Sequence, residues 1–353
     1  MAVIRVLVVD DSALVRKVLT EKLSKFSDIK VVGTAMDPYV ARDKILTLKP
    51  DVLTLDIEMP RMDGLSFLSK LMKHHPLPVI IISSLTPKDS KAALRALRLG
   101  AIEVIPKPGS TMSTPDNEKH MARAIRAAAS AQLKTTKVEE SSASEDLSDH
   151  LKQIETSHRI LAIGASTGGT TAIERVLSGL PKNTSGTVIC QHMPKSFTAS
   201  FAERLNEICQ MEVREAKDGD IVRTGTALIA PGGIHMLLKR SGSQFKIRLK
   251  DGPPVHHQKP AVDILFNSVA QEVGRNSVGV LLTGMGTDGA KGLLAMRKGG
   301  AHTISEHQSS CIVYGMPKAA EDLGASVKVT TLSNIPRGII KALAVEVGVP
   351  VAG

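Results

Sequence analysis

The sequence predicts an α/β protein with two domains, each built around a doubly wound parallel sheet. Short apolar runs alternate with helical patterns five times near the N-terminus, and a second series of the same kind follows later in the chain. A polar stretch rich in serine and acidic residues separates the two series, and 353 residues suffice for two cores. We therefore predict a first domain at 1–125, a linker at 126–155 and a second domain at 156–350.

Composition places the chain among ordinary globular proteins, with 42% hydrophobic and 23% charged residues. The N-terminal residues MAVIRVLVVDD pass directly into a predicted strand, unlike a signal peptide, and no apolar run is long enough to span a membrane. The three cysteines show no CxxC spacing, so neither a disulfide framework nor a zinc site is indicated. We expect a cytoplasmic protein without membrane insertion.

The net charge of +10 comes from both predicted domains. Residues 1–107 carry 17 Lys and Arg against 12 Asp and Glu, and residues 156–353 carry 22 against 15. A basic surface favours acidic partners. Aromatic residues make up only 2% and no basic run is concentrated, so we expect no nucleic-acid binding. A DNA-binding regulator stays open on the charge alone, and a salt-dependent DNA-shift assay would test it.

In the first domain, predicted strands and helices alternate with short loops. Each strand is a short apolar run, and each helix shows apolar residues at a helical spacing. A turn at Met59-Pro60 and Asp63-Gly64 precedes the third helix. The predicted order is strand 3–9, helix 13–23, strand 29–34, helix 39–48, strand 51–56, a helix to about 73, strand 78–83, helix 88–99, strand 101–105 and a closing helix at 120–133.

Polar residues stand where these strands end: Asp10, Asp11, Asp56, Ser83 and Lys107. The carboxyl ends of the strands in an open parallel sheet form one crevice. Three carboxylates there would repel each other without a cation, and Mg²⁺ prefers oxygen ligands of this kind. The lysine and the hydroxyl could then hold a phosphoryl group. A single residue of this set could be merely structural, such as a helix cap, but five at the ends of one sheet favour a site.

The segments VLVVDDS, LDIEMPRMDG, VIIIS and PKP, in this order and spacing, resemble the receiver domain of bacterial response regulators. The resemblance covers residues 1 to about 125. It implies that Asp56 accepts a phosphoryl group from a histidine kinase. It also implies roles for further residues: Asp10, Asp11, Asp56 and the backbone carbonyl of Glu58 hold Mg²⁺, and Ser83 and Lys107 contact the phosphoryl oxygens.

The chain departs from this pattern at Val104, three residues before the lysine, where many receivers carry an aromatic residue. The aromatic rotamer readout of phosphorylation that is usual in receivers is therefore not expected here.

The second domain begins with an apolar run, RILAI, that stops at the glycine-rich turn GASTGG, where a helical pattern begins. Later apolar runs and helical patterns predict the remaining elements. They are strands at 160–163, 187–191, 278–283 and 301–305, a β-rich region at 211–250 with a hairpin through Arg240-Ser241-Gly242, a loop at 253–260, helices after 171, 194, 261 and 289, and further helices to about 347.

Ser166, His192 and Asp288 each lie just past a buried strand of this domain. If those strands are parallel neighbours, the three side chains converge on one crevice. A serine hydroxyl is a weak nucleophile that needs a base, and the base needs an acceptor that orients it. The following helix and the loop 284–289 offer backbone N–H groups for an oxyanion.

Several alternatives compete with this interpretation. Cys190 lies two residues before His192, although a thiol inside an apolar strand is normally inert. The spacing Gly164-x-Ser166-x-Gly168 matches the nucleophile elbow of α/β-hydrolases, but the chain order Ser, His, Asp differs from theirs. A dinucleotide site would need an acidic residue at the end of a following strand, and we find none.

The segments IGASTGG, CQHMP, ALIAPGGIHM, PPVHHQKPAVD and LLTGMGTDGA resemble the catalytic domain of the CheB family, the chemotaxis protein-glutamate methylesterases. With the receiver, the resemblance spans nearly the whole chain. It implies that Ser166 is the nucleophile, His192 the general base and acid, and Asp288 the residue that orients it. Thr167 and Met285 match positions expected to line the oxyanion site.

The resemblance also implies what the chain acts on and with. The substrates would be glutamyl methyl esters, and glutamines, of methyl-accepting chemotaxis receptors. A chemotaxis histidine kinase would phosphorylate the receiver, and the unphosphorylated receiver would cover the Ser166 crevice. Mg²⁺ is expected for receiver phosphorylation, and no cofactor for ester hydrolysis. A response regulator that acts by binding, with an inactive esterase domain, stays open as an alternative.

Overall fold

The computed structural model describes residues 3–84, 86–107, 115–131 and 159–344. The chain divides into two compact units, residues 1–135 and 136–353. Most of the predicted linker at 126–155 lies outside the described residues, as does the end of the last predicted helix. The domain limits of 1–125 and 156–350 therefore stay predictions.

The first unit contains a parallel sheet with strand order β2-β1-β3-β4-β5. This order is that of a flavodoxin-like doubly wound fold, so the predicted fold class is confirmed for this unit. Its elements are β1 (Ile4–Val9), α1 (Ala13–Leu23), β2 (Ile29–Ala35), α2 (Pro38–Leu48), β3 (Val52–Asp56), α3 (Gly64–His74), β4 (Val79–Ser83), α4 (Pro87–Arg98), β5 (Glu103–Pro106) and α5 (Pro115–Ala129).

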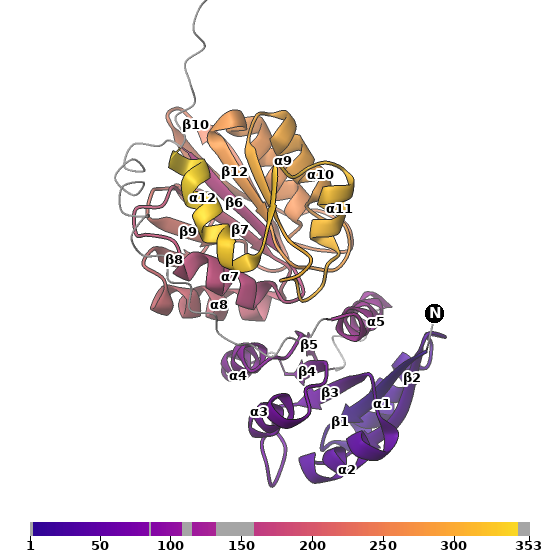
Figure 1. The fold of residues 1–353 in the computed structure, drawn as a ribbon. Helices are drawn as coiled ribbons and strands as arrows, with labels where there is room; N and C mark the ends of the chain where they lie inside the picture. The colour runs from indigo at the N-terminus through magenta and orange to yellow at the C-terminus, as the bar shows by residue number, and fades with distance from the viewer. Residues whose placement is uncertain (1–2, 85, 108–114, 132–158, 345–353) are drawn as a thin grey trace, which may run out of the picture. The chain divides into compact units, whose positions relative to one another are not determined.

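Helices cover both faces of this sheet (Figure 1), which explains why its central strands are continuous apolar runs. Every residue of β3 and of β4 is buried. Helix α1 packs against α5, and α3 packs against α4. Helix α5 begins at Pro115, five residues before the predicted start at 120.

The second unit contains a sheet of seven strands, all parallel, in the order β14-β13-β12-β6-β7-β9-β8. A separate antiparallel hairpin joins β10 to β11. The elements are β6 (Ile160–Ala165), α7 (Gly169–Ser178), β7 (Thr187–Gln191), α8 (Lys195–Ile208), β8 (Glu212–Glu215), β9 (Thr226–Ile229), β10 (His235–Ser241), β11 (Gln244–Lys250), α9 (Val262–Glu272), η2 (Gly274–Asn276), β12 (Ser277–Leu281), α10 (Ala290–Lys298), β13 (His302–Glu306), α11 (Met316–Asp322), β14 (Lys328–Thr330), η3 (Leu332–Asn334) and α12 (Ile335–Ala344).

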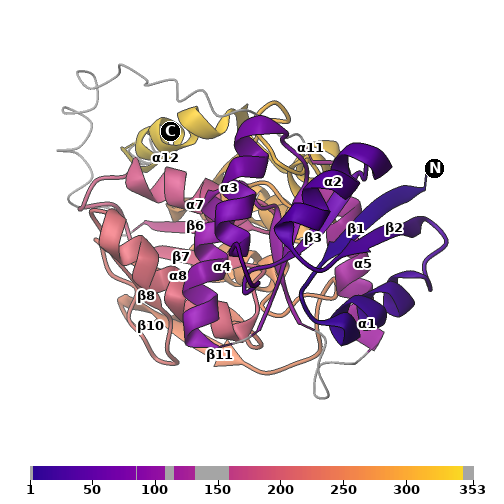
Figure 2. The same cartoon turned by 90° about the horizontal axis from the view of Figure 1, so that it is seen from below.

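The helices of this unit form two layers around the sheet (Figure 1). Helix α7 contacts α8 and α12 in one layer, and α10 contacts α9 and α11 in the other. Figure 2 shows α7 and α8 side by side along β6 and β7. All residues of β6, β7 and β12 are buried, so these three central strands provide a rigid support for the loops that follow them.

The structure confirms the predicted hairpin through residues 240–242 and the doubly wound fold of the second unit. It adds a short edge strand, β14, that the sequence did not predict. It also places β8 and β9, from the region predicted only as β-rich, in the parallel sheet. None of the helices in the described part of the chain combines the length and the apolar character needed to cross a bilayer.

Candidate active site

The ends of three neighbouring strands carry Ser166, His192 and Asp288. Ser166 follows β6, His192 follows β7, and Asp288 lies in the loop between β12 and α10. Because the sheet order is β12-β6-β7, with all three strands parallel, their carboxyl ends lie beside one another. The three strands are therefore parallel neighbours, as the predicted convergence of the three side chains requires.

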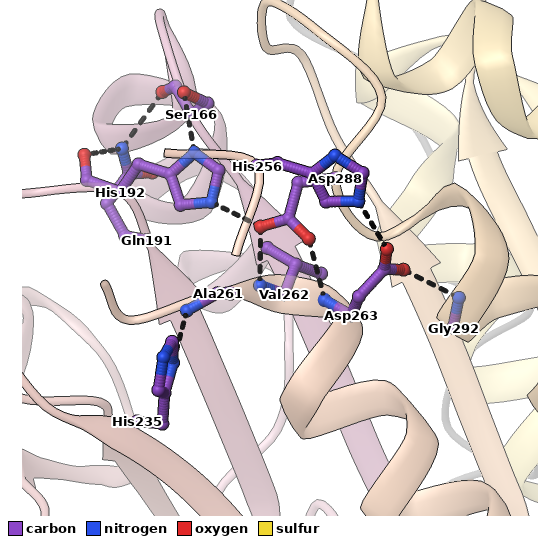
Figure 3. Close-up of polar contacts among 10 residues, drawn as sticks. All are labelled: Ser166, Gln191, His192, His235, His256, Ala261, Val262, Asp263, Asp288 and Gly292. Atoms are coloured by element: carbon purple, nitrogen blue, oxygen red, sulfur yellow. Dashed lines mark hydrogen bonds and ion pairs between the residues drawn. The ribbon is translucent and has the colours of Figure 1, made fainter. Parts of the chain in front are cut away.

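The three side chains form one hydrogen-bonded chain (Figure 3). The Ser166 hydroxyl lies 3.0 Å from Nδ1 of His192, and Nε2 of His192 lies 2.8 Å from Oδ2 of Asp288. An ionised carboxylate only accepts hydrogen bonds, so the proton of a neutral His192 belongs on Nε2. Nδ1 is then free to accept the hydroxyl proton of Ser166, as a general base must.

Asp288 is buried, with 2% of its surface exposed, and accepts three hydrogen bonds. Besides His192, the donors are the backbone N–H of Val262 at 2.8 Å and that of Asp263 at 2.9 Å. Burial would raise the pKa of the Asp288 carboxyl, but the hydrogen bond and charge of His192 and the two N–H groups outweigh it and lower that pKa. Asp288 is thus held as an anion at the first turn of α9.

Gln191, the last residue of β7, links the backbone of Ser166 to that of His192. Its buried side-chain amide donates from Nε2 to the backbone carbonyl of Ser166 at 2.9 Å and to that of His192 at 3.0 Å. The turn is held further by the Gly169 N–H, which donates to the Ser166 carbonyl, and by the Ser166 N–H, which donates to Thr283. The backbone on both sides of Ser166 is therefore held by hydrogen bonds within the protein.

Gly284 lies against Ser166. A Cβ atom added to it would stand 2.7 Å from Cβ of Ser166 and 2.3 Å from Sδ of Met316. We predict that Gly284→Ala displaces Ser166 and lowers the rate of Ser166 labelling by a fluorophosphonate by about 100-fold, since small displacements of reacting atoms cost about that much.

Gly252→Ala is the matched control for this prediction. A Cβ atom at Gly252 would meet only an ordinary contact, with Cδ2 of His235 at 3.8 Å, and we expect labelling at the wild-type rate. Equal labelling of the two variants would contradict the prediction, because it would mean that the turn relaxes without moving Ser166.

The structure argues against Cys190 as the nucleophile. Its thiol is 1% exposed within β7, and burial together with the charge of Asp288 raises its pKa well above the usual range for a thiol. A thiol that stays protonated is a poor nucleophile. Nδ1 of His192 is moreover already bonded to Ser166.

Two further predicted residues, Thr167 and Met285, lie next to this arrangement in the chain. Thr167 is buried on the turn after Ser166, and its carbonyl accepts a hydrogen bond from the Thr283 hydroxyl at 3.1 Å. Met285 is half-buried and follows Gly284, the glycine that approaches Ser166. Their role at an oxyanion stays a prediction.

In the first unit the structure brings the predicted polar residues together at the carboxyl edge of the sheet. Nζ of Lys107 donates to Oδ2 of Asp56 at 2.7 Å and lies 3.5 Å from Oδ2 of Asp10. The N–H of Glu58 donates to Oδ1 of Asp56 at 3.3 Å. Ser83, at the end of β4, is buried, and its hydroxyl donates to the carbonyl of the next residue. Val104 is a buried residue of β5.

The donor set of this cluster fits Mg²⁺. One oxygen each of Asp10, Asp11 and Asp56 lie within 4.8 Å of one another, and Lys107 forms an ion pair with Asp10 and with Asp56. Among the described residues, the buried Oδ2 of Asp10 receives no hydrogen bond. Burial raises the pKa of Asp56 to about 6 and also raises that of Asp10, so these carboxylates are held in a setting that favours a cation.

Three residues near Asp288 and the start of α9 were not predicted from the sequence: His235, His256 and Asp263. The buried His235 donates from Nε2 to the carbonyl of Pro253 at 3.0 Å and accepts the N–H of Ala261 on Nδ1 at 3.2 Å. Nε2 of His256 lies 3.0 Å from Oδ2 of Asp263. Both histidines stand in segments singled out above, but only the fold shows that they meet the start of α9.

Comparison with known families assigns both units. Residues 161–339 match the family model described as CheB methylesterase, and residues 6–117 match the response regulator receiver domain.

Individual proteins of the same family are similar to this chain over most of its length or over its second unit. The chain is 55% identical to a protein-glutamate methylesterase/protein-glutamine glutaminase 2 of Syntrophus aciditrophicus over 97% of this chain and 99% of that one. It is 49% identical to the protein-glutamate methylesterase/protein-glutamine glutaminase of Escherichia coli over 96% and 97% of the two chains. A crystal structure of the Thermotoga maritima CheB methylesterase catalytic domain matches 53% of this chain and 99% of its own, with 36% identity and a TM-score of 0.52.

Proposed function

Because this chain belongs to the CheB methylesterase family and carries a response regulator receiver domain, we propose that it is a phosphorylation-controlled serine esterase that hydrolyses glutamyl methyl esters of chemotaxis receptors. The observation that supports this most directly is the hydrogen-bonded chain from Ser166 through His192 to Asp288. Ser166 would be the nucleophile, His192 the general base and acid, and Asp288 the group that orients the imidazole.

In the first half of the reaction, the Ser166 oxygen attacks the carbonyl carbon of the ester while its proton passes to Nδ1 of His192. The imidazolium that forms is stabilised by Asp288 through the Nε2–H bond. Nδ1 then returns this proton to the departing methoxide, so methanol leaves and an acyl-enzyme remains on Ser166. Thr167 and Met285 would line the position of the negative oxygen.

In the second half, a water molecule attacks the acyl-enzyme while Nδ1 of His192 takes one of its protons. That proton returns to the Ser166 oxygen, and a free glutamate side chain is released. A glutamine side chain follows the same path, with ammonia taking the proton from Nδ1 and leaving, because ester and amide form tetrahedral intermediates of the same kind and give the same acyl-enzyme. The proposed deamidase activity therefore needs no second site, and we propose no cofactor for either hydrolysis.

Asp56 is the proposed phosphoryl acceptor of the receiver, with a chemotaxis histidine kinase as donor. Asp10, Asp11, Asp56 and the backbone carbonyl of Glu58 would hold Mg²⁺, which neutralises charge on the transferred phosphoryl group when bound. Lys107 already contacts the Asp56 carboxylate, and Ser83 stands at the end of the adjacent strand. Both are proposed to contact the phosphoryl oxygens. With no nucleic acid proposed as a partner, the receiver's output would be the esterase, in the cytoplasm.

We predict that a small acyl phosphate, with Mg²⁺, raises methanol release from methylated chemoreceptor membranes several-fold for the full chain, and that Asp56→Asn stays at the basal rate. The reason is that an amide cannot accept the phosphoryl group. Asp43→Asn, at an exposed acid of α2, is the matched control and should respond like the wild type. Ser166→Ala defines the background.

Each outcome of this experiment has a distinct meaning. Ser166-dependent release that ignores the phosphodonor would keep the esterase and reject control by the receiver. No release above the Ser166→Ala background, on a substrate shown to be methylated, would reject the esterase and favour a regulator that acts by binding.

A further inference from the structure

Helices α9 and α10 both begin beside the carboxylate of Asp288. A carboxylate at the start of each helix accepts hydrogen bonds from the first turn of the other. Asp288, just before α10, accepts the N–H groups of Val262 and Asp263 in the first turn of α9. Asp263, in that first turn of α9, accepts the N–H of Gly292 in the first turn of α10, at 2.7 Å from its Oδ1. This exchange fixes both carboxylates relative to both helices.

The second oxygen of Asp263 meets an imidazole (Figure 3). Nε2 of His256 lies 3.0 Å from Oδ2 of Asp263, whose side chain is only 7% exposed, whereas 34% of the His256 side chain reaches solvent. One side-chain nitrogen or oxygen atom each of His256, Asp263 and Asp288 lie within 4.8 Å of one another. A change in the charge of the His256–Asp263 pair therefore changes the electrostatic potential at Asp288.

The backbone that presents His256 is unusual. Val255 and Gln258 exchange two backbone hydrogen bonds, of 3.0 and 2.8 Å, across a two-residue turn. The residues inside the turn, His256 and His257, have φ values of 51° and 61°, in the region that favours glycine and asparagine. Conformations of this kind persist where the surrounding structure demands them, often beside an active site.

We propose that Asp263 and His256 form a second carboxylate–imidazole pair that positions Asp288, and through it His192, and that sets how readily His192 takes up a proton. The proposal rests on the proposed function, because it gives this pair a task at the same site. Asp263 and His256 are positioning residues, since they touch neither Ser166 nor the imidazole of His192 in the contacts described.

The groups that face Asp263 are known from each adjoining segment. The loop before α10 contributes Asp288, the loop at 253–260 contributes His256, and α10 contributes the N–H of Gly292. A negative Asp263 makes the protonated form of His192 easier to reach, and the Nε2–H that His256 directs at Asp263 offsets that influence. Loss of the acid and loss of the imidazole should therefore shift the pH dependence in opposite directions.

The test is the rate of Ser166 labelling by a fluorophosphonate in the full chain, measured from about pH 5 to 9. Asp263→Asn keeps an acceptor for the N–H of Gly292 and removes the negative charge. The acid limb of its pH–rate profile, where the labelling rate falls as the pH is lowered, should therefore move to lower pH by about half a unit or more. His256→Asn suits the backbone of the turn and removes the imidazole N–H that faces Asp263, so the acid limb of its pH–rate profile should move to higher pH. Asp263→Ala also removes the cap and should lower the labelling rate at the pH optimum by about 10-fold or more.

Glu272→Gln is the matched control. Glu272 ends the same helix α9 and pairs with Lys239, 2.8 Å away, so its loss tests the stability of the helix without touching the site. We expect the wild-type rate and pH profile. Acid limbs that stay in place for both Asp263→Asn and His256→Asn, or move in the same direction, would overturn the proposal even if Asp263→Ala failed to fold.

Labelling needs no receptor, so the result is separable from the proposed function. A chain that labels at Ser166 but releases no methanol from methylated receptors would reject the substrate while the pair could still be tested. Retained labelling with unshifted profiles would reject the pair while the esterase stands.

Discussion

Replacing Ser166 with alanine should lower methanol release from methylated chemoreceptor membranes by about 10⁴-fold or more. Ser166 supplies the atom that becomes acylated, and His192 faces it at 3.0 Å with Nδ1 free to accept its proton. Without that oxygen, His192 has no serine proton to accept and no acyl-enzyme can form. The measurement is methanol release with the full chain, Mg²⁺ and a phosphodonor.

Ser178→Ala is the control for this prediction. Ser178 lies at the end of α7, the helix that starts after the Ser166 turn, and its exposed hydroxyl donates to the carbonyl of Glu174. We expect that variant to release methanol like the wild type. A Ser166→Ala chain that kept more than a few per cent of the wild-type rate would show that another group is the nucleophile.

Much of the fold could be predicted from the sequence because parallel strands buried on both faces are nearly continuous apolar runs. The runs at β3, β4, β6 and β7 are of this kind, and each was predicted within one or two residues. Strand β14 has three residues, of which two are exposed and one is partly buried, so no apolar pattern marks it. It is a strand only because its neighbour β13 pairs with it.

The candidate triad could be predicted because its members stand directly after an apolar strand or in the loop that follows one, where the order of the sheet brings them together. Two residues within the quoted receiver segments have structural roles as helix caps: the Ser12 hydroxyl accepts the N–H of Val15, and Asp63 accepts that of Ser66. Local patterns distinguish such caps poorly from site residues, since the same residue types serve both.

The contacts around Asp288 could not be predicted, because they join segments that the sequence keeps apart. Asp263 and Gly292 are separated by 29 positions and meet only because α9 and α10 begin side by side. Gln191 donates to a carbonyl 25 positions away, at the end of a neighbouring strand. The spacing of apolar and polar residues along one helix or strand does not predict such contacts between distant segments.

Replacing Asp288 with asparagine should lower methanol release by about 10⁴-fold, because an amide cannot satisfy the three donors that surround this side chain. Oδ1 receives the N–H of Asp263, and Oδ2 receives those of Val262 and His192. An asparagine has one acceptor and one donor end, so either orientation sets an amide N–H against a backbone N–H. The site is buried, and the clash should also lower the free energy of unfolding by about 1–3 kcal/mol.

The orientation of the amide decides how catalysis fails. If the amide nitrogen takes the place of Oδ2, His192 must accept on Nε2 and carry its proton on Nδ1. It would then donate to Ser166 and could not take the serine proton. If the nitrogen takes the place of Oδ1, the His192 bond survives but the start of α9 loses its partner at Asp263, and the neutral amide stabilises the imidazolium less.

Methanol release and urea unfolding of the full chain test this prediction together. Asp251→Asn is the control, since Asp251 is 82% exposed on the loop before the 253–260 segment and pairs with Lys259. It should keep wild-type activity. An Asp288→Asn chain within tenfold of the wild-type rate would mean that His192 is oriented by its own backbone and by Gln191, and that the buried carboxylate serves α9 rather than the reaction.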